Sequence, residues 1–334
     1  MASSLASPHV DPFAQSTDPG LFVATLGHAD CLARLRQAIR RGPGLALVTG
    51  GAGSGKTILA AALVRDLAAE RAAGEARDGD AFLVGTIPDP TLCRTDVQFL
   101  RAILDQFGVP TGGGRTGLDL LTRFQRALAG DTGDGVPATL TGTPLLVIDD
   151  AASLVGSHFE ILRALLAFGD VAGPRGPRIV LFGRPELTDK VGRKRNLASR
   201  VTMSHALNPI NEEDTAALLA HRITVAGGGV GNGSLPRFAP AAVVAIAERA
   251  GAVPAEILRA ASATMDLALR SGRGVIEAST VAAALPAPEA NMDLVLSGPG
   301  AASTPPIAGA LQTRLAFVVP AGLDGAAPDM GGAR

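Results

Sequence analysis

Two short stretches of this sequence hold residues whose types and spacing could act on phosphate groups. The first, "GGAGSGKT", fits the pattern G-x-x-x-x-G-K-[ST], with Gly50, Gly55, Lys56 and Thr57 at the fixed positions. A short apolar strand pattern precedes it and a helical pattern follows, which is the context that a phosphate loop requires. Glycines let successive backbone N–H groups turn toward phosphate oxygens, and the helix N-terminus adds partial positive charge.

The residues of this loop have separate predicted roles. Lys56 would reach the β- and γ-phosphates of a bound nucleotide, and the Thr57 hydroxyl would take a place on Mg²⁺. The alternative is an ordinary glycine-rich turn in a chain with 41 glycines, but the flanking strand and helix favour the phosphate loop. The residues predicted to hold the nucleotide phosphates are Gly50, Gly51, Ala52, Gly53, Ser54, Gly55, Lys56 and Thr57.

The second stretch, "LLVIDDAASL", places two aspartates after four apolar residues. Asp149 at the end of a buried strand would hold Mg²⁺ together with Thr57; the alternative is a helix N-cap. Asp150 is the candidate general base, which must lie within hydrogen-bond reach of the attacking water. It could act as a slow base, as a base working through a second water, or as a simple cap.

Strand and helix patterns that must position these residues alternate from residue 45 to about residue 206. Several strands are apolar throughout, as strands buried on both faces must be, so we expect an α/β fold with a parallel sheet. Leu32, Leu35, Ala38 and Ile39 share one face of a helix that precedes the first strand. After Leu207 four helical segments predict a small all-α domain, and they span residues 211–228, 238–251, 254–272 and 277–285.

Composition disfavours several classes of protein. The net charge of −1 and the absence of Trp and Tyr disfavour a generic polyanion binder and a base-stacking platform. Cys31 and Cys93 lie in no metal-spaced pair, so we expect free thiols in a reducing cytoplasm. We expect no signal peptide and no membrane span, because the chain has neither a basic and apolar leader nor about 18 uninterrupted apolar residues.

Several segments, taken in order, give residues 11–286 a resemblance to the AAA+ ATPases of the ExeA (general secretion pathway protein A) type. This group is related to the TniB and MuB transposition ATPases. The strand end "LLVIDDAASL" stands where that family has Asp-Glu-Ala-Gln, and "RIVLFGRPELTDKV" resembles its Gly-Gln-Pro-Glu-Leu strand end. The other matching segments are "DPFAQSTDPGLF", "HADCLARLRQAI", "TIPDPTLCRTDVQFLRAILDQFGVP", "LNPINEEDTAALLAHRITVAGG" and "GAVPAEILRAASATMDLA".

This resemblance implies a P-loop NTPase fold of the AAA+ type, with a five-stranded parallel sheet, an all-α lid, and ATP and Mg²⁺ bound between them. It also implies homo-oligomers in which a neighbour's arginine completes the site. Arg200 matches that arginine, with Arg195 as second choice; the alternative for both is a solvated basic face. Residues 171–200 carry eight Lys and Arg against Glu186 and Asp189, which could also form a patch for DNA or an acidic partner.

The chain departs from the family pattern at four positions. Asp150 replaces a glutamate, and Ala152 replaces a glutamine. Arg184 replaces a glutamine that would sense the γ-phosphate, which a full charge could still do. Ala255 stands where the family has a lid arginine, and Arg259 lies one helical turn further on. Losing a lid cation would remove one electrostatic clamp on the transferred phosphoryl group.

We therefore predict an ATP-binding AAA+ protein that hydrolyses ATP slowly, with Asp150, Arg184 and Arg200 as catalytic residues and Thr57 and Asp149 on Mg²⁺. It would act as an oligomeric switch in a secretion or assembly pathway, in the cytoplasm. The alternatives are a non-hydrolysing, ATP-dependent binding module and a DNA-linked accessory ATPase of the transposition type. The expected organisation is a flexible N-terminal segment, a nucleotide-binding core, a helical lid and a mostly disordered Pro/Gly/Ala-rich tail, over residues 1–20, 21–207, 208–286 and 287–334.

Overall fold

The computed structural model describes residues 11–74, 81–131, 140, 142–226 and 235–286. The chain divides into residues 1–287 and 288–334, and every described residue belongs to the first unit. The predicted C-terminal tail lies outside the described residues. Within the described part of the chain, no helix is long and apolar enough to cross a membrane.

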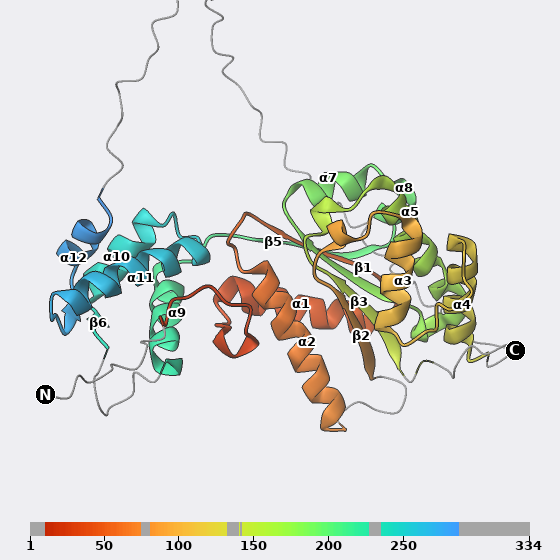
Figure 1. The fold of residues 1–334 in the computed structure, drawn as a ribbon, viewed down its shortest axis with the longest axis horizontal. Coiled ribbons are helices and arrows are strands. Elements are labelled where there is room, and N and C mark those ends of the chain that lie inside the picture. Colours follow the sequence, from red (N-terminus) through yellow and green to blue (C-terminus); the bar gives the residue numbers. More distant parts are fainter. Residues whose placement is uncertain (1–10, 75–80, 132–139, 141, 227–234, 287–334) are drawn as a thin grey trace, which may run out of the picture. The chain divides into compact units, whose positions relative to one another are not determined.

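Five parallel strands form the sheet, in the order β2-β3-β4-β1-β5 (Figure 1). The central strands β1, β3 and β4 are buried along their whole length, as the apolar runs predicted. The edge strand β5 alternates between half-buried and exposed residues. The strands are β1 (Gly44–Gly50), β2 (Phe82–Ile87), β3 (Thr143–Ile148), β4 (Arg178–Gly183) and β5 (Val201–Leu207).

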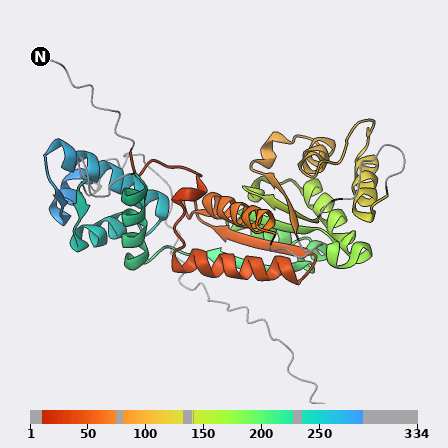
Figure 2. The same cartoon turned by 90° about the horizontal axis from the view of Figure 1, so that it is seen from below.

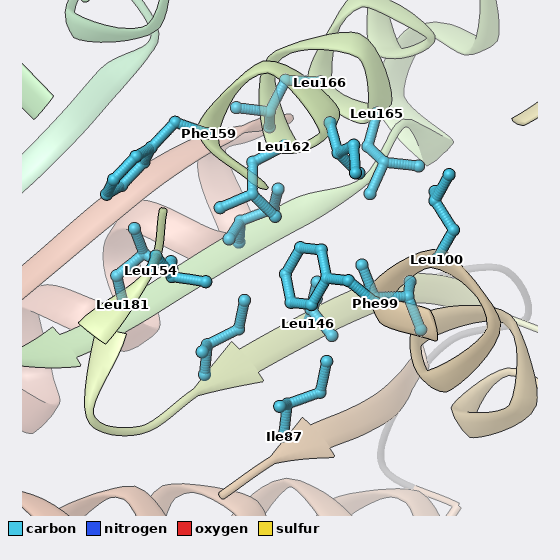
Figure 3. Close-up of a cluster of buried hydrophobic side chains, with 14 of the residues drawn as sticks. Ile87, Phe99, Leu100, Leu146, Leu154, Phe159, Leu162, Leu165, Leu166 and Leu181 are labelled. Atoms are coloured by element: carbon cyan, nitrogen blue, oxygen red, sulfur yellow. The ribbon is translucent and has the colours of Figure 1, made fainter. Parts of the chain in front are cut away.

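Helices cover both faces of this sheet. On one face, α1 (Leu26–Arg41) and α2 (Lys56–Ala72) pack against alternate residues of β1, β3 and β4 (Figure 2). On the other face, α3 (Asp96–Gln106), α4 (Gly117–Ala129) and α5 (Gly156–Ala167) enclose a larger apolar cluster. Figure 3 shows Phe99 of α3 and the leucines of α5 meeting strand residues such as Leu146 in that cluster. Both faces are therefore buried, which fixes the sheet as the rigid support of the loops at its ends.

Cap residues explain where several of these helices begin. The Thr25 side chain accepts a hydrogen bond from the His28 N–H at the start of α1. Thr95 and Thr116 form capping boxes at α3 and α4, in which the third helical residue bonds back to the cap. Short helical segments complete the core: α6 (Gly169–Ala172), α7 (Glu186–Gly192) and α8 (Arg195–Ala198).

The four helices expected after Leu207 are present, and they pack around an apolar cluster of their own. Two-residue strands β6 (Arg237–Phe238) and β7 (Val275–Ile276), which the sequence did not predict, pair in parallel. Phe13 of the N-terminal segment is 2% exposed and joins the same cluster, so the segment predicted to be flexible is anchored over its described residues. The helices are α9 (Glu212–Val225), α10 (Pro240–Arg249), α11 (Pro254–Arg270) and α12 (Ala278–Ala284).

Candidate nucleotide site

The phosphate loop connects the end of β1 to the N-terminus of α2. Gly53 and Gly55 have φ angles of +76° and +90°, which side chains of L-residues rarely adopt. A Cβ at Gly53 would also lie 2.8 Å from the Cβ of Ala255 in the lid. Helix α2 has no side-chain cap at Gly55, so its first N–H groups are left for an anion. The backbone therefore forms the cradle that the motif predicted.

Lys56 lies over this loop. Its Nζ donates to the carbonyls of Gly50 and Gly51, at 2.9 and 2.7 Å, and to Ser54 Oγ at 3.2 Å. Burial lowers the pKa of Lys56, and the nearby Asp149 carboxylate opposes that shift. The loop thus holds the ammonium group beside the helix N-terminus, where a bound phosphate would compete for its hydrogen bonds.

Thr57 and Asp149 meet although 92 residues separate them. Thr57 Oγ1 donates to Asp149 Oδ2 at 2.6 Å, and Asp149 Oδ1 accepts the Asp150 N–H at 2.9 Å. The Asp149 carboxylate is therefore directed at the phosphate loop, not at a helix N-terminus as the capping alternative required. A hydroxyl and a carboxylate are the hard oxygen donors that Mg²⁺ prefers. These two side chains fit the metal predicted for them.

Asp150 adopts an unusual backbone conformation. Its φ and ψ are 45° and 36°, in the left-handed region, which aspartate tolerates better than most residues. Its exposed side chain makes no cap hydrogen bond to the short 3-10 turn, η4 (Ala151–Ser153), that follows. The simple cap that the sequence left open is not formed, and the carboxylate is open to solvent next to Asp149.

Arg184 lies at the same end of the sheet, where the strands finish. It follows β4, and its neighbour Gly183 is so close to the loop after β3 that a Cβ there would lie 3.0 Å from the Ala152 nitrogen. The positive charge of Arg184 contributes to the lowered pKa of Lys56. The structure therefore brings Arg184 to the phosphate loop, as the resemblance implied.

Arg200 lies at the opposite end of the sheet, where the strands begin. Its carbonyl accepts the N–H of Leu45 at the start of β1, about 20 Å from the phosphate loop by the length of a seven-residue strand. Its guanidinium binds both carboxylate oxygens of Asp170 at 2.6 Å. Arg200 therefore cannot reach the site of its own chain, and its predicted role is open only in a neighbour's site. Arg195, the second choice, is exposed on α8.

The basic residues of 171–200 do not lie together as one patch. Arg178 is 6% exposed and donates to the Ile39 carbonyl at 2.8 Å. Lys190 donates to the Ala152 carbonyl, and Lys194 pairs with Glu160 at 3.1 Å. Only a smaller exposed group, which includes Arg193 and Arg195, stays available to a partner.

A pocket of about 560 Å³ adjoins the phosphate loop. Its walls come from the loop, from the N-terminal segment and from the lid residues Ile210, Leu218 and Leu258. The lid reaches the loop through its backbone, because the Ala255 N–H donates to the Gly53 carbonyl at 3.1 Å. Arg259 pairs with Glu256 at 2.6 Å, so within the described residues it does not replace the missing lid cation.

His28 lies against the phosphate loop and was not among the site residues predicted from the sequence. Its Nε2 is 3.0 Å from the Ser54 carbonyl oxygen and its Nδ1 is 2.6 Å from Thr25 Oγ1. Burial lowers its pKa. A signal was present, because His28, Cys31 and Leu35 follow the spacing of the buried face of α1.

The geometry of the loop, the strand-end carboxylate and the parallel sheet defines the class of this domain. Residues 39–191 match the family model of the AAA domain. This segment is therefore similar to AAA domains, and the sheet has the fold of P-loop AAA+ proteins.

Particular relatives extend the similarity beyond this domain. Over 247 residues the chain is 29% identical to General secretion pathway protein A of Aeromonas hydrophila, which covers 73% of this chain but 40% of that protein. The Aeropyrum pernix ORC2 protein, solved in ADPNP and ADP complexes, has a TM-score of 0.60 at 18% identity and covers 83% of this chain and 71% of its own. Drosophila ORC bound to DNA has a TM-score of 0.54 at 17% identity, over 85% and 69% of the two chains. At these identities the two structures show a shared fold.

Proposed function

We propose that this chain binds ATP with Mg²⁺ and hydrolyses it slowly, as an oligomeric switch. The observation that carries the proposal is the contact of 2.6 Å between Thr57 and Asp149, beside the ammonium group of Lys56. When bound, Mg²⁺ would neutralise charge on the phosphate oxygens. Asp150 would orient the attacking water, and Arg184 would stabilise negative charge on the phosphoryl group. The complexes of the ORC2 relative with ADPNP and ADP support a nucleotide as the ligand.

The test is nucleotide binding and turnover in the wild type and in Lys56→Ala. We expect the variant to lose most Mg-ATP binding, because it removes the one side-chain cation that lies in the loop. The matched control is Lys194→Ala, which removes an exposed lysine paired with Glu160 and should leave binding unchanged. Equal binding by the wild type and Lys56→Ala would refute the proposal. ATP binding without turnover in the wild type and in Asp150→Glu would favour the non-hydrolysing module.

We also propose a place for this switch in secretion or assembly, on the similarity to General secretion pathway protein A. Because the chain spans 40% of that protein, its partner has to be found by experiment. An oligomer would let Arg200 serve a neighbour's site. Sedimentation with and without ATP tests this, and a monomer under both conditions would exclude the trans role of Arg200. The cytoplasmic location stays a prediction.

A DNA-linked role is the second candidate. The observations that favour it are the exposed Arg193 and Arg195 and the similarity in fold to an ORC bound to DNA. Neutralising both should make the plot of the log of the DNA-binding constant against log salt concentration less steep by about 1.8, because each lost phosphate contact contributes about 0.9. The control is Arg34→Ala with Arg40→Ala, which removes two paired arginines of α1. Equal slopes in the three proteins would remove the support for DNA binding.

A further inference from the structure

The ring of His28 is fixed by two hydrogen bonds behind the phosphate loop. His28 is 5% exposed. A carbonyl oxygen can only accept, so the Nε2 that lies 3.0 Å from the Ser54 oxygen must carry the proton and donate it. In the neutral ring Nδ1 is then an acceptor, and the Thr25 hydroxyl donates to it across 2.6 Å. The geometry thus selects one tautomer and one ring orientation.

The bond to Ser54 determines how the next peptide group is oriented. The peptide between Ser54 and Gly55 is planar and trans, so its N–H points to the side opposite its carbonyl. With the carbonyl held by His28, the Gly55 N–H is directed away from the ring. A Cβ on Gly55 would lie 2.7 Å from His28 Nε2, so the ring sits directly against the loop.

The same ring is connected to the lid. Thr25, which bonds to Nδ1, is the N-cap residue of α1. The next N–H along the chain, from Leu26, donates to both carboxylate oxygens of Asp214 at 3.1 and 3.3 Å. Asp214 is in the first turn of the lid helix α9, where its own N–H donates to the Asn211 side chain at 2.7 Å. A continuous series of hydrogen bonds and covalent bonds therefore runs from the lid to the phosphate loop.

We propose that His28 is a positioning residue that holds the Ser54–Gly55 peptide ready for a phosphate group and couples it to the lid through Thr25 and Asp214. The inference rests on the proposed nucleotide site and deepens it. His28 also lines the pocket beside the loop, and its positioning role is exerted through the peptide that it holds. A lid that moves would pull on the N-terminus of α1, and the histidine would transmit that change to the loop.

Two variants separate hydrogen bonding from packing. His28→Leu fills a similar buried volume but leaves the Ser54 carbonyl and the Thr25 hydroxyl without this partner. His28→Gln retains an amide N–H that can donate to Ser54. The matched control is His158→Leu, because His158 is equally buried but its two ring nitrogens have no hydrogen-bond partner within the described part of the chain.

The first readout is amide hydrogen exchange of the nucleotide-free protein over residues 50–59. We expect exchange there to be several-fold faster in His28→Leu than in the wild type, and unchanged in His158→Leu. The second readout is Mg-ADP affinity by titration calorimetry. We expect a roughly tenfold loss in His28→Leu, as for a buried carbonyl left without its donor. His28→Gln should stay within about threefold of the wild type.

The coupling to the lid is tested by a double-mutant cycle with Asp214→Ala. The double variant should lose less ADP affinity than the two single losses combined, because both changes interrupt one path. Additive losses would overturn the coupling. Equal losses in His28→Gln and His28→Leu, or wild-type exchange and affinity in His28→Leu, would overturn the positioning role. A wild type that binds no ADP would refute the proposed function, and the exchange experiment would still judge the role of His28 in the loop.

Discussion

Replacing Asp150 by glutamate should increase ATP turnover and decrease stability at the same time. The Asp150 carboxylate is exposed beside Asp149, whose own oxygens are engaged by Thr57 and by the Asp150 N–H. Asp150 is thus the carboxylate of the pair whose side chain is open to an attacking water. Glutamate would carry that group one C–C bond further, by roughly 1.5 Å.

Two magnitudes follow from this geometry. Misplacing a catalytic group by about 1 Å can cost about 10²-fold in rate, so we expect Asp150→Glu to gain about 10- to 100-fold. The backbone at this position is left-handed, with φ 45°, and glutamate lacks the short polar side chain that helps aspartate there. A penalty of about 1 kcal/mol is expected, which corresponds to a Tm about 2–4 °C lower for a domain of this size.

The assay is steady-state ATP turnover at saturating Mg-ATP, with thermal unfolding measured on the same samples. Lys56→Ala provides the background rate, and Asp150→Asn removes the charge without adding length, so it should gain nothing. If Asp150→Glu binds ATP as the wild type does but turns over no faster, reach is not what limits the reaction. An unchanged Tm would refute the argument from backbone strain.

Three further predictions concern the lid, the histidines and Arg200. Ala255→Arg should tighten ADP binding about tenfold by calorimetry, because Ala255 lines the pocket and a charged donor there would bind phosphate; Arg259→Ala, which only breaks the pair with Glu256, should change nothing. The free energy of unfolding by urea should fall from pH 7.5 to pH 5.5. Burial lowers the pKa of His28, His158 and His205 below 6.5. As the pH falls, the unfolded chain therefore takes up protons that the folded chain does not, which favours unfolding. His158→Leu should make the free energy of unfolding depend less steeply on pH. Asp170→Asn should change the free energy of unfolding by less than about 0.5 kcal/mol, because the pair with Arg200 is largely exposed. If ATP turnover of Asp170→Asn rises only at concentrations where oligomers form, Arg200 acts in a neighbour's site.

The sheet and the helices were predictable because their signals are local. Buried strands such as β3 read as apolar runs, and caps such as Thr95 lie within four residues of the turns that they start. The pair β6 and β7 has two residues in each strand, which is too short for any period to be seen. Phe13 is one aromatic residue in a polar segment, and only the lid cluster that it joins gives it a structural role.

The site residues likewise divide into those that the sequence could predict and those that only the folded chain reveals. Lys56, Thr57 and Asp149 directly follow strand or loop patterns, so their place at the carboxyl edge follows from the order of elements along the chain. The bidentate pair of Arg200 with Asp170 is a tertiary contact over 30 residues. Sequence position shows that Arg200 precedes a strand, but it does not show what the side chain binds when no neighbour is present.

Long-range contacts also change how the missing lid arginine is understood. At Ala255 the lid meets the phosphate loop through a backbone hydrogen bond to Gly53, which needs no particular side chain. The second link runs over 188 residues, from Asp214 to Leu26, and continues over 26 residues, from His28 to Ser54. Because neither link contributes a cation, both can transmit lid position without adding charge at the phosphates. A lid linked to the loop in this way would report on a bound nucleotide more than help to cleave it, in keeping with the slow switch that we propose.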